Sequence, residues 1–163
     1  MAARSKSKAT SRASKDAIAV LKADHRQVEQ WFAEFASARS AKRKQDLAAS
    51  ICNALTVHAK IEEQIFYPEF LKVTKDKDTH HEAIVEHDGA KKLIADIENS
   101  SPSDEYFHSK VHVLSEMVKH HVKEEEKSDG MFAEAKKSKI DLEALGRRLL
   151  QRKSELQAEA QTA

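Results

Sequence analysis

The sequence predicts an all-α protein, an up-down-up-down four-helix bundle with an additional C-terminal amphipathic helix. The composition favours helices, because the 163 residues include only three glycines and two prolines. Apolar residues recur three and four positions apart in successive segments, which places them on one helix face. Short polar turns separate these segments, and short turns favour antiparallel neighbours.

We divide the chain into three parts. Residues 1–14 are small, polar and basic, and we expect a disordered tail there because almost nothing can be buried. Such a tail aids solubility, or alternatively contacts nucleic acid or lipid. Residues 15–137 hold the four bundle helices. Residues 138–163 form a last helix that we expect to pack across one end of the bundle, with a coiled-coil partner contact as the alternative.

The first two helices are long. The first is predicted from about Ser14, its expected N-cap, to about Ala38. The second is predicted from about Lys42 to Phe70, and Pro68 should kink or end it. Their inward stripes comprise Ile18, Leu21, His25, Val28, Phe32 and Phe35 in the first helix and Leu47, Ile51, Leu55, His58, Ile61 and Ile65 in the second.

The second half of the chain repeats this pattern. A polar linker over residues 75–79 leads into a third helix from about Thr79 to Ile97. The fourth helix opens after Ser103, and its pattern weakens at residues 127–130 but can continue to about Lys137. A last amphipathic helix starts at about Asp141.

Charge and cysteine content restrict the function classes. Five of the 28 basic residues fall in residues 1–15, so 23 basic groups face 27 acidic ones in the remaining, mildly acidic chain. The bundle itself therefore does not suit a nucleic-acid groove, and no apolar run suits a membrane span. The single cysteine, Cys52, excludes an intrachain disulfide framework, and with no signal-peptide pattern we expect a cytoplasmic protein.

Histidine recurs on the apolar stripe of all four helices, at His25, His58, His87 and His121. In the second and fourth helices a glutamate follows four residues later, Glu62 and Glu125. Residues four apart lie on the same helix face, one turn above each other. Packing the four helices would therefore bring four imidazoles and two carboxylates into one pocket.

The antiparallel topology places these residues at one level. His25 and His87 fall in the first half of their helices, whereas His58 and His121 fall about two thirds of the way along theirs, at ~1.5 Å of rise per residue. Without metal, such a core would leave buried polar groups unpaired, each at a cost of about 1–3 kcal/mol. A metal site is therefore favoured over a polar, metal-free core.

The ligand types narrow the choice of metal. Imidazole and carboxylate without thiolate suit Fe, Mn, Zn or Cu. Two carboxylates between two imidazole pairs suit a dinuclear centre bridged by Glu62 and Glu125. Ferritin-like bundles use Glu-x-x-His, with a different order and spacing. The zincin motif His-Glu-x-x-His is absent, because His81-Glu82 is followed by Val85 where the motif has its second histidine.

These residues resemble the hemerythrin-like, or HHE cation-binding, domain over about Lys15 to Ala135. The matching segments are Asp24-His25, His58-x-x-x-Glu62-Glu63, Phe66-Tyr67-Pro68, Glu86-His87 and His121-x-x-x-Glu125-Glu126. The resemblance implies two iron ions in an oxo- or hydroxo-bridged non-haem centre. It further implies that His25 and His58 hold one iron, that His87 and His121 hold the other, and that Glu62 and Glu125 bridge them.

The chain departs from the oxygen-carrying members of that family. They have a further histidine four residues from the one on the third helix, where this chain has Ala83 and Lys91, and they tend to have aspartate in place of Glu125. One iron is then left with an open position, or takes water or another side chain. The reserve ligands are His80, Tyr67, Tyr106 and Glu29.

The resemblance leaves two functions open. The first is a di-iron protein that handles O2, H2O2 or NO as a sensor, scavenger or slow oxidase, and an open iron position favours redox reaction over oxygen storage. The second is a non-catalytic module for iron binding, storage or sensing. We expect a monomer or weak homodimer that binds a small molecule, with neither nucleic acid nor membrane as partner.

Overall fold

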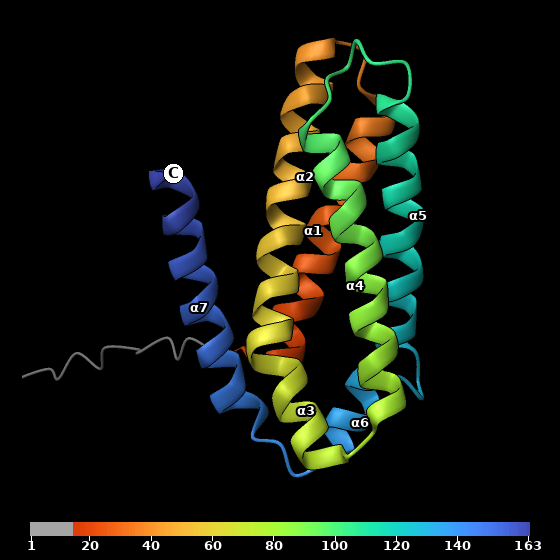
Figure 1. Ribbon diagram of the computed structural model, residues 1–163. Coiled ribbons are helices and arrows are strands. Elements are labelled where there is room, and N and C mark those ends of the chain that lie inside the picture. Colours follow the sequence, from red (N-terminus) through yellow and green to blue (C-terminus); the bar gives the residue numbers. More distant parts are fainter. Residues whose placement is uncertain (1–14) are drawn as a thin grey trace, which may run out of the picture.

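Four long helices run alternately up and down around a shared core (Figure 1). They are α1 (Ala17–Ser37), α2 (Ala41–Ile61), α4 (Lys77–Glu98) and α5 (Phe107–Glu126). The computed structural model describes residues 15–163, so the expected tail over residues 1–14, with its Ser14 cap, lies outside the described residues. Within the described range every regular element is a helix, which confirms the predicted all-α bundle.

Helix starts are fixed by side chains that accept a hydrogen bond from the backbone N–H three residues later. Asp16 caps α1 through Ala19 at 2.8 Å, and Ser40 caps α2 through Arg43 at 3.1 Å. Asp76 caps α4 in the same way, as does Asp141 for α7. The first helix therefore begins at Ala17, with Asp16 as its N-cap.

The second predicted helix is longer than expected and changes its winding. A π-helical turn, η1 (Glu62–Phe66), follows α2 directly and leads into α3 (Tyr67–Thr74). Pro68 lies in the first turn of α3, where its missing N–H does not break the helix. The expected end near Phe70 is wrong, because the helix continues to Thr74 and ends where Lys75 adopts a φ of 63°. The linker expected over residues 75–79 is also shorter, because α4 already begins at Lys77.

The fourth predicted helix is shorter than expected. The α5 helix starts at Phe107, after a turn in which Asp104 accepts a hydrogen bond from the Tyr106 N–H at 2.8 Å. It ends at Glu126, and a separate short helix, α6 (Met131–Lys137), follows. The continuation to Lys137 is therefore interrupted, because the chain turns tightly through Gly130.

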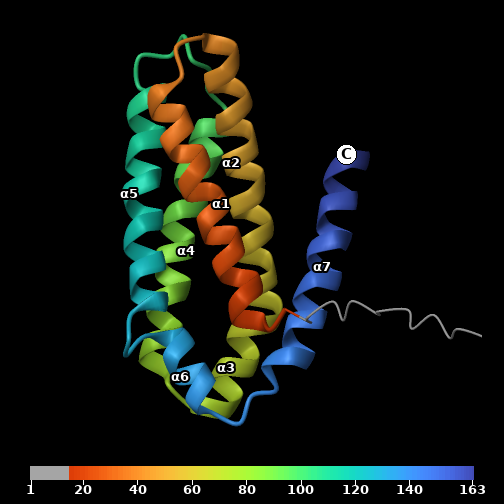
Figure 2. The same cartoon turned by 180° about the vertical axis from the view of Figure 1, so that it is seen from behind.

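The last helix, α7 (Leu142–Thr162), runs back along the outside of α1 and α2, and its C-terminal end stands away from the bundle (Figure 2). Leu145 and Leu149 are buried against this side. Gly146 permits the approach, because a Cβ there would lie 2.8 Å from the backbone carbon of Asp16. No helix within residues 15–163 has the length and apolar character needed to cross a membrane.

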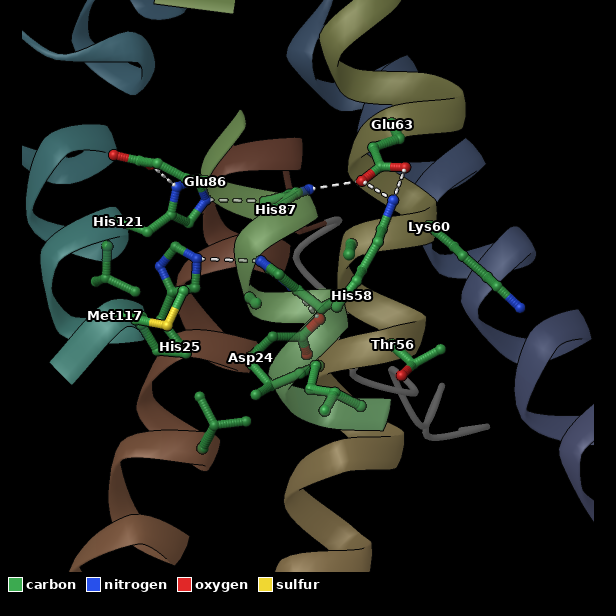
Figure 3. A pocket seen from close by; sticks show the side chains of 18 of the residues that line it. Asp24, His25, Thr56, His58, Lys60, Glu63, Glu86, His87, Met117 and His121 are labelled. Carbon is green, nitrogen blue, oxygen red and sulfur yellow. Dashed lines mark hydrogen bonds and ion pairs between the residues drawn. The ribbon is translucent and has the colours of Figure 1, made fainter. Parts of the chain in front are cut away.

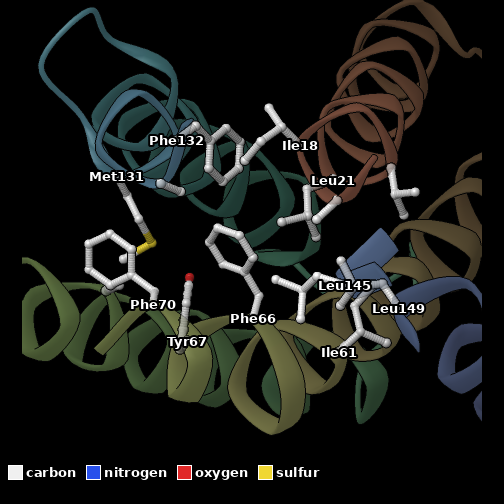
Figure 4. Packing of buried hydrophobic residues seen from close by; sticks show 14 of the residues in the cluster. Ile18, Leu21, Ile61, Phe66, Tyr67, Phe70, Met131, Phe132, Leu145 and Leu149 are labelled. Carbon is white, nitrogen blue, oxygen red and sulfur yellow. The ribbon is translucent and has the colours of Figure 1, made fainter. Parts of the chain in front are cut away.

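Two hydrophobic clusters fill the bundle, one at each end. The cluster near α6 and α7 joins aromatic side chains to aliphatic ones from several helices, as Figure 4 shows for Ile18, Leu21, Ile61, Phe66, Tyr67, Phe70, Phe132, Leu145 and Leu149. The cluster at the opposite end includes Phe32, Ile51 and Leu114. A layer of buried histidine and glutamate separates the two clusters, because the polar residues interrupt each apolar stripe at the same height.

Candidate metal centre

The structure brings all six predicted site residues together in the middle of the bundle. The four imidazoles come from four different helices: His25 from α1, His58 from α2, His87 from α4 and His121 from α5 (Figure 3). The two carboxylates lie one turn beyond His58 and His121. Glu62 is fully buried and Glu125 is 2% exposed, so both charges are removed from water.

The imidazoles form two pairs. Nε2 of His25 lies 3.1 Å from Nε2 of His58, and Nε2 of His87 lies 3.2 Å from Nε2 of His121. Figure 3 shows both pairs with their Nε2 atoms turned toward each other. Each pair therefore presents two nitrogen donors to one point, as a shared cation requires.

Each carboxylate reaches both pairs. One Glu62 oxygen lies 3.1 Å from Nε2 of His58, and the other lies 3.2 Å from Nε2 of His87. One Glu125 oxygen lies 3.4 Å from Nε2 of His25, and the other lies 3.3 Å from Nε2 of His121. This arrangement suits two carboxylates that bridge two cations.

A carboxylate also stands behind each imidazole. Nδ1 of His58 lies 3.1 Å from Asp24, and Nδ1 of His87 lies 2.8 Å from Glu63. Glu86 contacts Nδ1 of His121, whereas Glu126 lies 3.5 Å from Nδ1 of His25 and forms no hydrogen bond with it. Such partners fix the ring orientation and leave Nε2 free to bind a cation.

These four outer carboxylates stand out in the sequence only as parts of motifs, and no role was predicted for them. A signal was present, because each is the chain neighbour of a predicted ligand. Each outer carboxylate, however, contacts a histidine that lies on a different helix. Asp24 precedes His25 but contacts His58, and Glu86 precedes His87 but contacts His121. The chain order therefore does not say which histidine each carboxylate serves.

Among the four reserve ligands, Tyr67 is the one whose side chain enters the centre. Its hydroxyl donates to Glu125 at 2.8 Å and lies 3.1 Å from both a Glu62 oxygen and Nε2 of His87. Burial, reinforced by the two carboxylates, raises the pKa of Tyr67 well above its usual value, so the phenol keeps its proton.

The π-helical turn explains why Tyr67 points inward. In an α-helix a residue five positions after Glu62 would be rotated off its face. Here the Tyr67 N–H donates to the Glu62 carbonyl, a bond across five residues that widens the turn. Both side chains therefore face the centre.

The other reserve ligands lie elsewhere. Tyr106 is 63% exposed and precedes α5 at the far end of the bundle. Glu29 forms a surface ion pair with Arg26 at 3.2 Å. The His80 ring makes an edge contact with the Tyr67 ring, with the ring centroids 6.1 Å apart, and His80 is not itself one of the residues that meet at the centre.

The buried charges compensate one another in the metal-free protein. Burial lowers the pKa of His58, but the Glu62 carboxylate outweighs it and the pKa rises to about 10. Burial also opposes protonation of His121, yet Glu125 raises its pKa to about 11. Burial and the nearby His58 together lower the pKa of His25 to about 4. The paired carboxylates thus favour the protonated forms of His58 and His121, and bound cations would replace those protons.

Orphaned oxygens show that the residues suit cations. One oxygen of Glu62 and one of Glu125 accept no hydrogen bond within the described chain, although imidazole nitrogens lie within 3.4 Å. Both oxygens face the His25 and His58 pair. The ligand atoms of His25, His58 and Glu62 lie within 4.8 Å of one another, as do those of Glu62 and the second pair. Glu62 belongs to both groups, which fits a centre of two ions.

An antiparallel helical bundle with buried histidines and carboxylates at its middle defines a class of cation-binding proteins. The family model of the hemerythrin HHE cation-binding domain matches residues 16–133, and the chain belongs to this family. The fold agrees: a solved hemerythrin HHE cation-binding domain-containing protein from Mycobacterium kansasii superposes with a TM-score of 0.70 over 91% of each chain, at 17% identity.

A similar curated protein is longer than this chain. It is described as a DNA nickase from Nostoc sp. and is 32% identical over 107 residues, or 66% of this chain. The match spans about 30% of the length of that relative. The likeness therefore concerns one part of the nickase.

Proposed function

We propose that this protein is a non-haem di-iron protein that reacts with peroxide. The observation that carries the proposal is the pairing of imidazoles at 3.1 and 3.2 Å around two carboxylates that reach both pairs. Family membership supports cation binding at this place. The ligand types, which include no thiolate, suit Fe, Mn, Zn or Cu, and the choice of iron among them rests on the resemblance to hemerythrin-like domains.

Each residue has a role in the proposal. His25 and His58 would hold one iron, His87 and His121 the other, and the two bridging carboxylates are Glu62 and Glu125. When bound, the irons would supply two-electron redox chemistry. The outer carboxylates would orient the imidazoles and hold a proton on Nδ1, so that Nε2 can bind the cation, and the surrounding apolar clusters would limit access of water.

The two proposed iron positions differ in the number of protein donors. The position with fewer donors would have room for peroxide to bind. The His25 and His58 position is reached by two nitrogens and two carboxylate oxygens. The other position has the same set and, in addition, the Tyr67 hydroxyl, 3.1 Å and 3.4 Å from its imidazole nitrogens. The first position therefore has more room for an external molecule, and we place peroxide binding there.

Metal analysis with matched variants tests the proposal. Wild type loaded with ferrous iron should hold close to two irons per chain, whereas His58→Ala and Glu62→Ala should lose iron and melt at a lower temperature, because metal that binds only the folded state stabilises it. The control is His112→Ala, an exposed histidine on the same helix as His121. Full iron content in both ligand variants would refute the site.

Steady-state peroxide consumption then separates catalysis from metal binding alone. Iron-loaded wild type should consume peroxide, and Glu62→Ala should not. A protein that holds two irons but leaves peroxide untouched would be a non-catalytic module.

One contact favours that second candidate, an iron-sensing module. Lys153 on α7 forms an ion pair with Asp24, and Asp24 contacts Nδ1 of His58. The last helix is thus joined to the centre through one carboxylate. If the protein is a sensor, iron loading should change the proteolysis rate or amide exchange of α7, and unchanged rates would count against sensing.

A further inference from the structure

A cavity of about 400 Å³ lies in the bundle beside the candidate centre (Figure 3). The histidines of both pairs line it, and its walls are largely aliphatic, with Val28, Leu55, Ile94, Met117 and Val118 among them. Pockets that bind organic molecules have about this size and character, roughly 300–1,000 Å³ with few polar groups.

The cavity is far larger than the proposed function requires. A water molecule occupies about 30 Å³ in the liquid, so this space would take roughly 13 of them, and peroxide or a diatomic gas needs only a small part of it. Apolar walls gain little from contact with water, and unfilled volume in a core lowers stability. An apolar chain would satisfy these walls better than a small polar molecule.

The mouth of the cavity opens between the second and third long helices. The exposed lining residues lie on α2, η1 and α4, and they are Lys60, Gln64 and Lys91; half-buried Thr56 lies one turn before Lys60. Two of the three exposed residues carry a positive charge. The polar entrance and apolar interior together match a molecule with one charged end.

The charges at the mouth favour an anion. The three acidic lining residues, Asp24, Glu63 and Glu86, each contact an Nδ1 atom of a histidine in the centre. Lys91 pairs with Glu63 at 2.7 Å. Lys60 is exposed and takes part in none of the ion pairs formed within residues 15–163, and Figure 3 shows its ammonium turned away from the histidines. Pairing with a carboxylate at the mouth therefore requires the Lys60 side chain to rotate toward the cavity, and no ion pair within residues 15–163 opposes that rotation.

We propose that this cavity binds an unbranched aliphatic carboxylate, with its chain between the aliphatic walls and its carboxylate at the mouth beside Lys60. The far end of the chain then lies next to the four histidines. This inference goes beyond the proposed function, because binding needs no bound metal. If the centre holds metal, the same ligand would cover its approach from this side.

A chain-length series tests the proposal. Octanoate, decanoate and dodecanoate are titrated calorimetrically into the full-length protein, with and without iron, below their micelle concentrations. Each added pair of methylenes should tighten binding by about fifteenfold, from ~0.8 kcal/mol per buried CH₂, until the chain fills the cavity. Absence of saturable binding by all three acids would overturn the proposal, whatever the iron content.

Substitutions inside and outside the cavity test where decanoate binds. Ala90→Phe fills the cavity from α4 and should weaken decanoate binding at least tenfold, and Thr56→Phe at the mouth provides a second block if Ala90→Phe misfolds. Wild-type affinity in both folded variants would show that decanoate binds elsewhere. Lys60→Glu should weaken decanoate several-fold, whereas Lys72→Glu, an exposed lysine on α3 outside the cavity, should not. Equal affinity for decylammonium and decanoate would refute the assignment of a carboxylate.

Discussion

The hydroxyl of Tyr67 lies 2.8 Å from a carboxylate oxygen of Glu125, a residue 58 positions further along the chain. The same hydroxyl reaches Glu62 at 3.1 Å, so one phenol connects both carboxylates that span the centre. Oxygen-carrying relatives are expected to place an additional histidine at this side of the centre. Here Tyr67, which follows a π-helical turn, lies 3.1 Å from Nε2 of His87, and Ala83 belongs to the same buried cluster.

Tyr67→Phe should change the spectrum of the iron-loaded protein more than its iron content. Ferric iron bound beside Tyr67 would displace the phenol proton, the resulting phenolate would absorb visible light, and the variant would lack that absorption while the six other ligands remain. In the metal-free state the lost hydrogen bonds should reduce the free energy of unfolding by about 1–3 kcal/mol. Absorption spectra and urea titrations check both results.

The control for this substitution is Tyr106→Phe, since Tyr106 is 63% exposed. An identical visible spectrum in Tyr67→Phe and wild type would show that the phenol is no ligand. Its role would then be limited to hydrogen bonding with the two carboxylates.

The common height of the six site residues in the bundle could be predicted, because it depends only on helical periodicity and on the antiparallel order of the helices. His58 with Glu62, and His121 with Glu125, keep the spacing that puts both side chains on one face. The antiparallel order of the helices then fixes the height of His25 and His87. Helix periodicity and topology were therefore enough to assemble the centre.

The inward turn of Tyr67 could not be predicted with the same certainty, because it depends on one local change in winding. A π-helical turn leaves no periodic apolar signal, and Pro68 is compatible with a kink, a stop or a wider turn. The break after Glu126 was predicted only as a weakening of the pattern over residues 127–130. Met131 and Phe132 are apolar at helical spacing, and only the close packing of Gly130 shows the turn.

Asp24→Asn should weaken metal binding without removing a ligand. Asp24 accepts from Nδ1 of His58 at 3.1 Å, and loss of such a partner typically costs about 10–100-fold in metal affinity. Lys153→Met should have a smaller effect in the same direction, because it removes the cation that holds Asp24. Competition with a chelator measures both affinities.

Asp88→Asn is the matched control, because Asp88 also neighbours a predicted ligand in the chain but its side chain is 62% exposed. Equal chelator curves for Asp24→Asn and Asp88→Asn would show that the contact with His58 does not support the metal.

Gly130→Ala should destabilise the fold and loosen the centre together. A Cβ at this position would overlap the carbonyl oxygen of Glu124 and come within 2.9 Å of that of Glu125. Backbone atoms cannot move aside as a flexible side chain does, so the end of α5 that carries Glu125 must shift. We expect a loss of about 1–3 kcal/mol in the free energy of unfolding and weaker metal retention.

Gly89→Ala is the contrasting change within a helix. Its Cβ would lie 3.1 Å from the terminal methyl of Met117, which can move. Higher helix propensity should then make this variant as stable as wild type, or more stable by up to about 1 kcal/mol. Equal losses in both variants would argue against close packing at Gly130.

Cys52 should be inert in the folded protein. Burial, with a contribution from Glu98, raises the pKa of its thiol to about 12, and the side chain is 1% exposed. The reactive thiolate is therefore scarce near pH 8, whereas an unfolded chain has a cysteine pKa of about 8.5. A thiol reagent at pH 8 should modify native protein more than about a thousandfold more slowly than protein in urea, from the two thiolate fractions, and comparable rates would contradict the buried placement.

Ala83→His should fail to supply the histidine that the oxygen carriers have, because Tyr67 already fills the space. Ala83 is 5% exposed and packs in the same cluster as Tyr67. An imidazole there overpacks the cluster, and we expect a loss of about 1–3 kcal/mol in the free energy of unfolding.

In a Tyr67→Ala background the new ring gains room, so the double variant should be more stable than the sum of the single effects, by about 0.5–3 kcal/mol. Urea unfolding of the four proteins measures this coupling, and iron-loaded spectra show whether the introduced imidazole binds metal only when the tyrosine is gone. If the two substitutions are additive and Ala83→His alone is neutral, the two side chains do not compete for one place.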